Sequence, residues 1–315
     1  MPDTHELAVV HPYAEPSPPR WGTILLTLLL TIVLGLGLAL FVVVGFWPEP
    51  AAPAPRADAA LGRTEPADSA RSDTADYEAT ALPGGRFELD PTVPAGTEAG
   101  TVYRWPLLLS DDFEGTELNP VTWQPYSGGA AGAVGQRSAA ALTVSDGTLK
   151  VTSRGLTSGG MGWQPGQTYG RWEVRARTEA GAGYRPAILL WPEGENWPIG
   201  GEIDFLDSPH PDRSETNFVV HYGPQNAQDG VTVGGDFTDW HTYAVEWAPD
   251  HVAGFVDGQE VFRTADPQKI PTGPMRLTIQ QDIGPSEDGW TPAPDDSTPD
   301  EVRMEVDWVR IYAAP

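Results

Sequence analysis

Short stretches of alternating apolar and polar residues, separated by turn residues, constrain the fold of this chain most. In residues 171–177 the alternation is strict, and Trp172, Val174 and Ala176 share one side, as in a strand that buries one face. Similar faces recur later in the chain, at Tyr243, Val245 and Trp247, at Met275, Leu277 and Ile279, and at Met304, Val306 and Trp308. From Val102 onward, no segment of helical periodicity approaches these alternating segments in length. We therefore predict an all-β antiparallel sandwich, large enough for one sheet to curve into a groove.

Composition restricts the partners of the domain. The chain carries 44 acidic against 19 basic residues, a net charge of −25, and no basic patch is visible. Nucleic acids and anionic lipid headgroups need such a patch, and a polyanionic glycan is a poor match for so acidic a protein. The absence of cysteine excludes disulfides and thiolate metal sites. We expect a neutral ligand and a monomeric protein.

The N-terminal part contains a predicted membrane anchor. No residue from Gly22 to Phe46 is charged, and this run exceeds the ~20 residues that span a bilayer. Trp21 and Trp47 flank it, where interfacial aromatics are enriched. We predict a short tail at 1–20 and a transmembrane helix at 21–47, with the large domain extracytoplasmic, in the periplasm or at the cell surface. A cleaved signal peptide is the alternative, but the acidic start of the chain argues against it.

The next segment differs in composition from both neighbours. Residues 48–100 are rich in Ala, Pro, Asp, Thr and Ser and poor in large apolar residues, so they bury too little surface to offset their ordering entropy. We predict a flexible linker over 48–100, followed by one β-sandwich domain over 101–315.

Three carboxylates lie within six residues of one otherwise apolar strand, residues 202–207. Glu202 and Asp204 are two residues apart and share a face of an extended strand. Asp207 has the opposite parity, unless a one-residue bulge near Phe205 or Leu206 returns it to that face. With the bulge, the three acids form a row of the kind that glycosidic bond cleavage uses. Without it, Asp207 is the first residue of a turn.

Several segments in order resemble one enzyme family. The segment Trp197–Asp207 resembles the active-site strand of glycoside hydrolase family 16, the laminarinase and lichenase group, with its pattern Glu-x-Asp-x-x-Glu. Further segments between Leu107 and Tyr312 resemble its other strands, namely Asp111–Leu118, Tyr169–Arg175, Asp239–Trp247, Val256–Gly258 and Val306–Tyr312. The resemblance implies a jelly-roll sandwich and a retaining, endo-acting hydrolase of β-linked glycans, most simply β-1,3- or mixed-linkage β-glucan.

The resemblance also implies roles for the three acids. Glu202 is the expected nucleophile, Asp204 the neighbour that keeps the carboxyl pKa values apart, and position 207 the general acid and base. The family has Glu at this last position, whereas this chain has Asp207. The shorter side chain withdraws the carboxyl group by about 1.5 Å, and a displacement of about 1 Å can already slow catalysis. Three alternatives follow: a backbone shift compensates and the enzyme is active, the mechanism is weakened or altered, or the domain binds glycan without cutting it. A transglycosylase is a further alternative.

Other residues are candidates for the groove. Trp197, Trp191 and Trp163 are predicted stacking surfaces for sugar rings, with core packing as the alternative. His221 and Gln280 lie on predicted neighbouring strands, from which they would reach a sugar hydroxyl or a catalytic carboxylate. Glu193 and Glu195 precede the active-site strand, and either could supply the missing acid, with surface solvation as the alternative.

No cofactor is required by this chemistry. The resemblance implies a structural calcium away from the groove, with Asp307 as its candidate ligand and an exposed strand acid as the alternative. The six histidines show no spacing typical of a transition-metal site.

Overall fold

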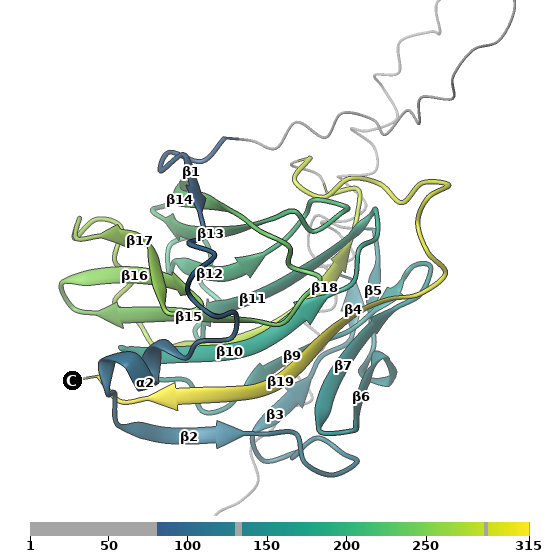
Figure 1. Cartoon of the computed structure of the whole chain (residues 1–315), viewed down its shortest axis with the longest axis horizontal. Helices are drawn as coiled ribbons and strands as arrows, with labels where there is room; N and C mark the ends of the chain where they lie inside the picture. The colour runs from purple at the N-terminus through teal and green to yellow at the C-terminus, as the bar shows by residue number, and fades with distance from the viewer. Residues whose placement is uncertain (1–80, 130–133, 287–288, 315) are drawn as a thin grey trace, which may run out of the picture. The chain divides into compact units, whose positions relative to one another are not determined.

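Two stacked β-sheets form the framework of the domain (Figure 1). The computed structural model describes residues 81–129, 134–286 and 289–314. The first sheet, which we call the groove sheet, has eight strands in the order β1 (Arg86–Glu88), β14 (Ala227–Gly234), β13 (Glu215–Tyr222), β12 (Glu202–Asp207), β11 (Tyr184–Pro192), β18 (Met275–Ile283), β9 (Gly160–Trp163) and β3 (Trp123–Pro125).

The second sheet, the outer sheet, covers the other side of the core. Its strands are β17 (Gln259–Thr264), β16 (His251–Val256), β15 (His241–Ala248), β10 (Gly170–Thr178), β19 (Val302–Tyr312), β7 (Thr148–Ser153), β6 (Leu142–Ser145) and, paired with β19, β2 (Leu107–Asp111). In the described part of both sheets the pairs are antiparallel, except that β1 runs parallel to β14. The remaining elements are β4 (Gly128–Gly129), β5 (Gln136–Arg137) and β8 (Thr157–Ser158), which form a small third sheet, with the five-residue helix α2 (Ala99–Tyr103) and the 3-10 turn η1 (Ala139–Ala141). The predicted all-β sandwich is confirmed.

The core between the sheets follows the period-two pattern of the sequence. Trp172, Val174 and Ala176 of β10 are buried, as are the predicted apolar faces of β15 and β18. The prediction was wrong for Trp308. The register of β19 against β10 shifts at Asp307, so Val309 and Ile311 enter the core between the sheets. Trp308 lies on the outer side, where it stays buried beneath Arg310.

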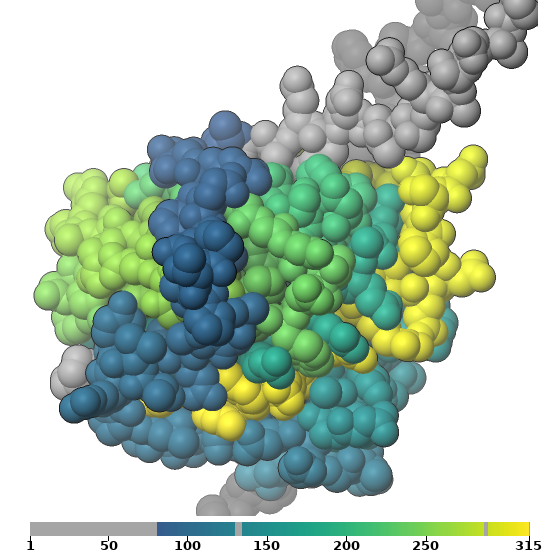
Figure 2. Space-filling view, viewed as in Figure 1, coloured from purple at the N-terminus to yellow at the C-terminus, as the bar shows by residue number. Residues whose placement is uncertain are grey.

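The folded domain begins earlier than predicted. Residues 81–100, which the sequence placed in the linker, belong to the sheet framework, because β1 pairs with β14 and the following segment crosses the outer sheet (dark blue in Figure 2). Glu173 of β10 is fully buried and accepts hydrogen bonds from the backbone N–H groups of Ala99 at 2.5 Å and Gly100 at 2.9 Å. The segment is held by backbone pairing and by hydrogen bonds to a buried carboxylate. Its polar composition gives no sign of such contacts.

The predicted transmembrane helix at 21–47 lies outside the described residues. Among the helices in the described ranges, none has the length and apolar character that crossing a bilayer requires.

Replacing Glu173 tests whether residues 97–103 are held by this buried carboxylate. Glu173→Ala leaves two backbone N–H groups without their acceptor and removes a negative charge that acts on the neighbouring buried Arg171, and we expect it to lower the free energy of unfolding by about 3–5 kcal/mol. Glu260→Ala, which removes an exposed ion pair with Arg263, is the control and should cost ~0–1 kcal/mol. Urea denaturation of the full-length protein measures both, and equal losses would show that the segment is not anchored in this way.

Candidate active site

A β-bulge in β12 brings the three carboxylates to one side of the groove sheet. Leu189 of β11 pairs with Asp204 and Ile188 pairs with Leu206, so Phe205 is the extra residue. Ile203, Phe205 and Leu206 enter the core, while Glu202 and Asp207 line a groove on the opposite face. The bulge predicted at Phe205 or Leu206 is present, and Asp207 is not simply the start of a turn.

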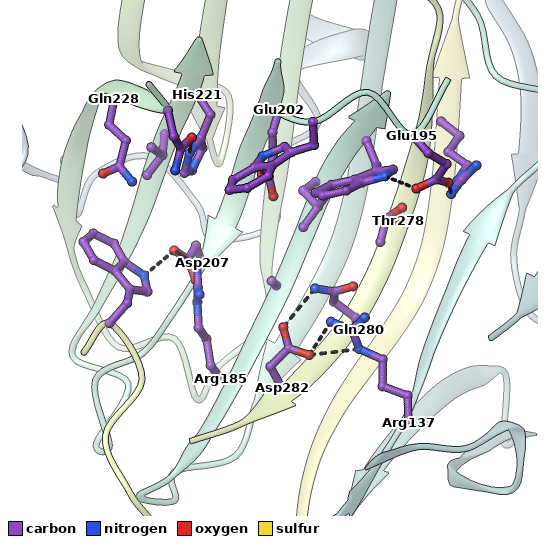
Figure 3. A pocket seen from close by; sticks show the side chains of 18 of the residues that line it. Arg137, Arg185, Glu195, Glu202, Asp207, His221, Gln228, Thr278, Gln280 and Asp282 are labelled. Carbon is purple, nitrogen blue, oxygen red and sulfur yellow. Dashed lines mark hydrogen bonds and ion pairs between the residues drawn. The ribbon is translucent and has the colours of Figure 1, made fainter. Parts of the chain in front are cut away.

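The groove has a volume of about 490 Å³ and crosses neighbouring strands of the groove sheet (Figure 3). Its walls combine aromatic rings with charged and amide side chains, as expected for a ligand with many hydroxyl groups. The polar and aromatic residues that line it are Tyr126, Arg137, Arg185, Trp191, Glu195, Trp197, Glu202, Asp207, His221, Asn226, Gln228, Arg276, Thr278, Gln280, Asp282 and Trp290.

Glu202 lies above Asp207 in Figure 3. Its Oε2 accepts a hydrogen bond of 2.7 Å from the Trp197 indole Nε1. Burial raises the pKa of Glu202 to about 8, and the negative charge of Asp204 adds to this rise, while His221 opposes it. Glu202, the predicted nucleophile, therefore binds its proton more tightly than an ordinary glutamate does.

His221 offsets the second negative charge of the row. Its Nε2 lies 3.1 Å from Asp204 Oδ2, and its Nδ1 lies 2.8 Å from Asn226 Oδ1. Both ring nitrogens thus face oxygen atoms, which favours the doubly protonated imidazolium. Burial alone would lower the pKa of His221, but Asp204 and Glu202 raise it to about 9. The predicted contact of His221 with one of the three carboxylates is present, and its partner is Asp204.

Asp207 is surrounded by donors. Arg185 of β11 binds both of its carboxylate oxygens, with Nη2 to Oδ2 at 2.7 Å, and Trp290 Nε1 donates to Oδ2 at 2.8 Å. Its backbone N–H donates to Thr216 Oγ1 at 3.1 Å. Burial raises the pKa of Asp207, and the Arg185 guanidinium acts against that rise. The third acid is therefore on the predicted face but is paired with a cation.

The predicted aromatic surfaces divide into two groups. Trp191 and Trp197 both line the groove, with their rings nearly parallel at 13° and centroids 6.1 Å apart. The prediction was wrong for Trp163, which is buried in the core edge-on to Trp123. Strand parity explains this, because Gly160 and Gly162 of β9 face Tyr126 and Arg276 on the groove side, and Met161 and Trp163 therefore face the core.

Gln280 lies in the groove, as predicted. Its Oε1 accepts a hydrogen bond of 2.6 Å from Tyr126, and its Nε2 donates to Asp282 at 3.0 Å. Asp282 also binds Arg137. Sequence reasoning missed Arg185, Arg137, Asp282, Arg276, Tyr126 and Trp290. Arg185 has the parity of Trp191 on one strand and Asp282 that of Gln280 on another, so alternation could have found these two.

Glu193 and Glu195 do not replace the shortened acid. Glu193 accepts a hydrogen bond of 2.7 Å from the Gly166 backbone N–H. Glu195 lines the groove and pairs with Arg276 and with Trp191 Nε1 at 2.9 Å. Burial would raise the pKa of Glu195, but these two partners lower it below its ordinary value. A carboxyl that holds its proton so weakly is a poor general acid at neutral pH.

Asp307 does not fit the calcium site that the resemblance implied. Its carboxylate forms an ion pair with Arg175, whose guanidinium also lies over the Trp240 ring. The Arg175 guanidinium thus lies beside the carboxylate where a calcium ion would have to bind. In the described ranges there is also no cluster of three or more His, Asp or Glu side chains able to hold a metal ion.

Comparison with known proteins identifies the family. Residues 133–310, more than half of the chain, match the family described as Glycosyl hydrolases family 16. The chain belongs to this family. A "Beta-glucanase" of Rhodothermus marinus is 30% identical over 188 residues, which cover 53% of this chain and 64% of that protein. A "Keratan-sulfate endo-1,4-beta-galactosidase" of Sphingobacterium multivorum is 31% identical over 163 residues, which cover 47% of this chain and 37% of that protein.

The fold of this family 16 protein also matches solved structures. The catalytic domain of an endo-1,3-beta-glucanase (laminarinase) from Thermotoga petrophila RKU-1 superposes with a TM-score of 0.62 at 24% identity, covering 66% of this chain and 98% of that chain. The predicted family and its jelly-roll sandwich are therefore confirmed. The matched region spans less than two thirds of the length of either relative named above.

The pairing of His221 with Asp204 predicts how Glu202 titrates in this family 16 site. Because the positive charge of His221 lowers the pKa of Glu202, removing it in His221→Gln should move the Glu202 titration midpoint above about 8. Carbon-13 NMR of glutamate-labelled full-length protein measures the midpoint, with Glu202→Gln assigning the signal. His251→Gln, on the outer sheet, is the control. An unchanged midpoint in His221→Gln would contradict the ion pair.

Proposed function

We propose that this protein is an endo-acting glycosidase that cleaves a neutral β-linked polysaccharide, in the first instance a β-1,3- or mixed-linkage β-glucan, with retention of configuration. The observation that carries this proposal is the bulge at Phe205, which places Glu202 and Asp207 on one groove face with Asp204 between them. Membership of family 16 and the names of its β-glucanase and laminarinase relatives support the reaction class and the substrate.

In the first step the Glu202 carboxylate attacks the anomeric carbon. A Glu202–carbon bond forms while the bond to the leaving sugar oxygen breaks, and that oxygen takes the proton of the Asp207 carboxyl group. The imidazolium of His221 balances Asp204, so Glu202 is not held next to an uncompensated negative charge when it ionises. The Trp197 indole orients the attacking carboxylate through its bond to Oε2.

In the second step water resolves the covalent intermediate. The water oxygen attacks the anomeric carbon, its proton passes to the Asp207 carboxylate, and the bond to Glu202 breaks. The product keeps its original configuration, and both carboxyl groups return to their starting states. Trp191 and Trp197 offer apolar faces against which pyranose rings stack during this sequence.

One observation favours a second candidate function. Asp207 is one methylene shorter than the family acid and is paired with Arg185, which is the environment of a structural carboxylate. On this alternative the domain binds β-glucan in the same groove without cutting it. A transglycosylase, in which a sugar hydroxyl replaces water in the second step, remains a variant of the first proposal.

We also propose that the domain acts outside the cytoplasm, attached through the apolar segment at 21–47. Only the sequence supports this part of the proposal. Fractionation of cells that express the full-length chain and a variant lacking residues 1–47 tests it, and release of the activity or binding from the membrane fraction by the deletion is the expected result.

Reducing-end release separates the enzyme from the binding module. Full-length protein is incubated with laminarin, lichenan and keratan sulfate, and we expect new reducing ends from one or both glucans. Glu202→Gln should abolish release, and Asp207→Asn should lower it by about 10²–10⁴-fold, the usual contribution of acid–base catalysis. Asp207→Glu restores the missing methylene and should raise release by up to ~100-fold.

Binding is measured on the same variants by affinity electrophoresis. Glucan binding without cleavage by the wild type and Asp207→Glu would establish the binding module and reject the enzyme. Cleavage of keratan sulfate alone would reject the neutral glucan. Glu260→Ala, remote from the groove, is the matched acidic control.

A further inference from the structure

Asp207 is held by contacts that the proposed mechanism does not require. Arg185 binds Oδ1 through Nε and Oδ2 through Nη2, and Trp290 donates a further hydrogen bond to Oδ2. Three N–H donors thus face two oxygens, and Oδ2, which accepts two of them, has no site left for a carboxyl proton. This geometry stabilises the ionised form, whereas a general acid must carry a proton.

Access to this carboxylate is also restricted. Asp207 is 0% exposed, although the groove that it borders is open and Glu202 on the same strand is partly exposed. A general acid works within about 2.6–3.2 Å of the oxygen that it protonates. Both residues that contact the carboxylate, Arg185 and Trp290, themselves line the groove. The Asp207 carboxylate is therefore covered by its own hydrogen-bond donors rather than by solvent.

The charges around this pair come from four strands. Asp204 on β12 acts on both Asp207 and Arg185, and Asp282 on β18 also lies close enough to act on Arg185. Beyond them lie Glu202 on β12 and the His221 imidazolium on β13. Arg137 on β5 pairs with Asp282. Arg185 is therefore the cation nearest to Asp207, and two further carboxylates favour its place on the groove wall.

We propose that Arg185 is a positioning residue that controls the reaction through Asp207. It keeps the carboxylate ionised and turned to the groove wall in the resting site, so that protonating a poor leaving group requires this ion pair to open. Trp290 donates to the same carboxylate and helps to keep it in this position. This inference rests on the proposed function and adds a leaving-group requirement to it: a glycoside whose leaving group departs as a stable anion does not need the Asp207 proton, and a polysaccharide does.

The first test compares two substrates on the full-length protein. 2,4-Dinitrophenyl β-laminaribioside loses its phenolate without protonation, whereas laminarin needs an acid. Arg185→Met removes the cation at similar volume, and we expect the ratio of kcat/KM for laminarin to that for the aryl glycoside to rise about tenfold, within the range of acid catalysis. Trp290→Phe should raise the same ratio by less. Arg263→Met, which disrupts an exposed ion pair on the outer sheet, should leave the ratio unchanged.

The second test needs no catalysis. Trp290 donates to Asp207, so its indole N–H signal reports the protonation of that carboxyl group. The full-length protein has 12 tryptophans, and nitrogen-15 labelling with Trp290→Phe assigns this signal. In Arg185→Met the pH midpoint of the signal should move upward, because the cation that favours the carboxylate is gone. Arg185→Lys keeps the charge and should keep the midpoint close to that of the wild type.

Together the two tests distinguish failure of the proposed role of Arg185 from failure of the proposed function. A raised ratio together with a raised midpoint supports the role of Arg185. Equal loss on both substrates with an unmoved midpoint shows that Arg185 is merely structural and overturns the inference. If the wild type cleaves neither substrate, the proposed function fails; a raised midpoint would then still establish that Arg185 holds Asp207 ionised, and an unmoved one would reject this as well.

Discussion

The groove chemistry of this protein depends on one extra residue in one strand. Because side chains alternate along a strand, an unbulged β12 would place Asp207 in the core with Ile203. The bulge at Phe205 reverses the parity after Asp204, so Phe205 and Leu206 both serve the core and Asp207 joins the groove. The bulge disrupts the strand pairing locally. Burial of the Phe205 and Leu206 side chains in the core offsets this loss.

The row of acids that results would be unstable without compensation. Three carboxylates on one face of one strand repel one another and are poorly solvated. His221 on β13 pairs with Asp204, Arg185 on β11 pairs with Asp207, and the Trp197 indole binds Glu202. The two neighbouring strands therefore supply one cation each. The two cations act on different carboxyl groups. His221, paired with Asp204, favours ionisation of Glu202, whereas Arg185 opposes protonation of Asp207.

Much of the fold could be predicted, because alternation and turn pairs report which residues face the core. Alternation also exposes the parity problem of Asp207, and the sequence predicts its solution at Phe205 or Leu206. It does not predict a further bulge at Asp307, where a shift in register moves Trp308 to the other face of its sheet. The predicted place of Trp163 in the groove was wrong, because glycines before a tryptophan do not show whether its side chain faces the groove or the core. The sequence could not predict that Trp290 lines the groove, because Trp290 lies between β18 and β19, outside any strand whose alternation would show its direction.

The central claim is that Glu202 is the nucleophile of a glycan-cleaving groove. 2,4-Dinitrophenyl 2-deoxy-2-fluoro-β-laminaribioside tests it most directly, because its leaving group needs no acid and its fluorine slows hydrolysis of the intermediate. Mass spectrometry of the full-length protein after incubation should show one added fluoro-disaccharide, located by peptide mapping on Glu202 and absent from Glu202→Gln. No adduct, or an adduct on Asp207 or another carboxylate, would contradict the account.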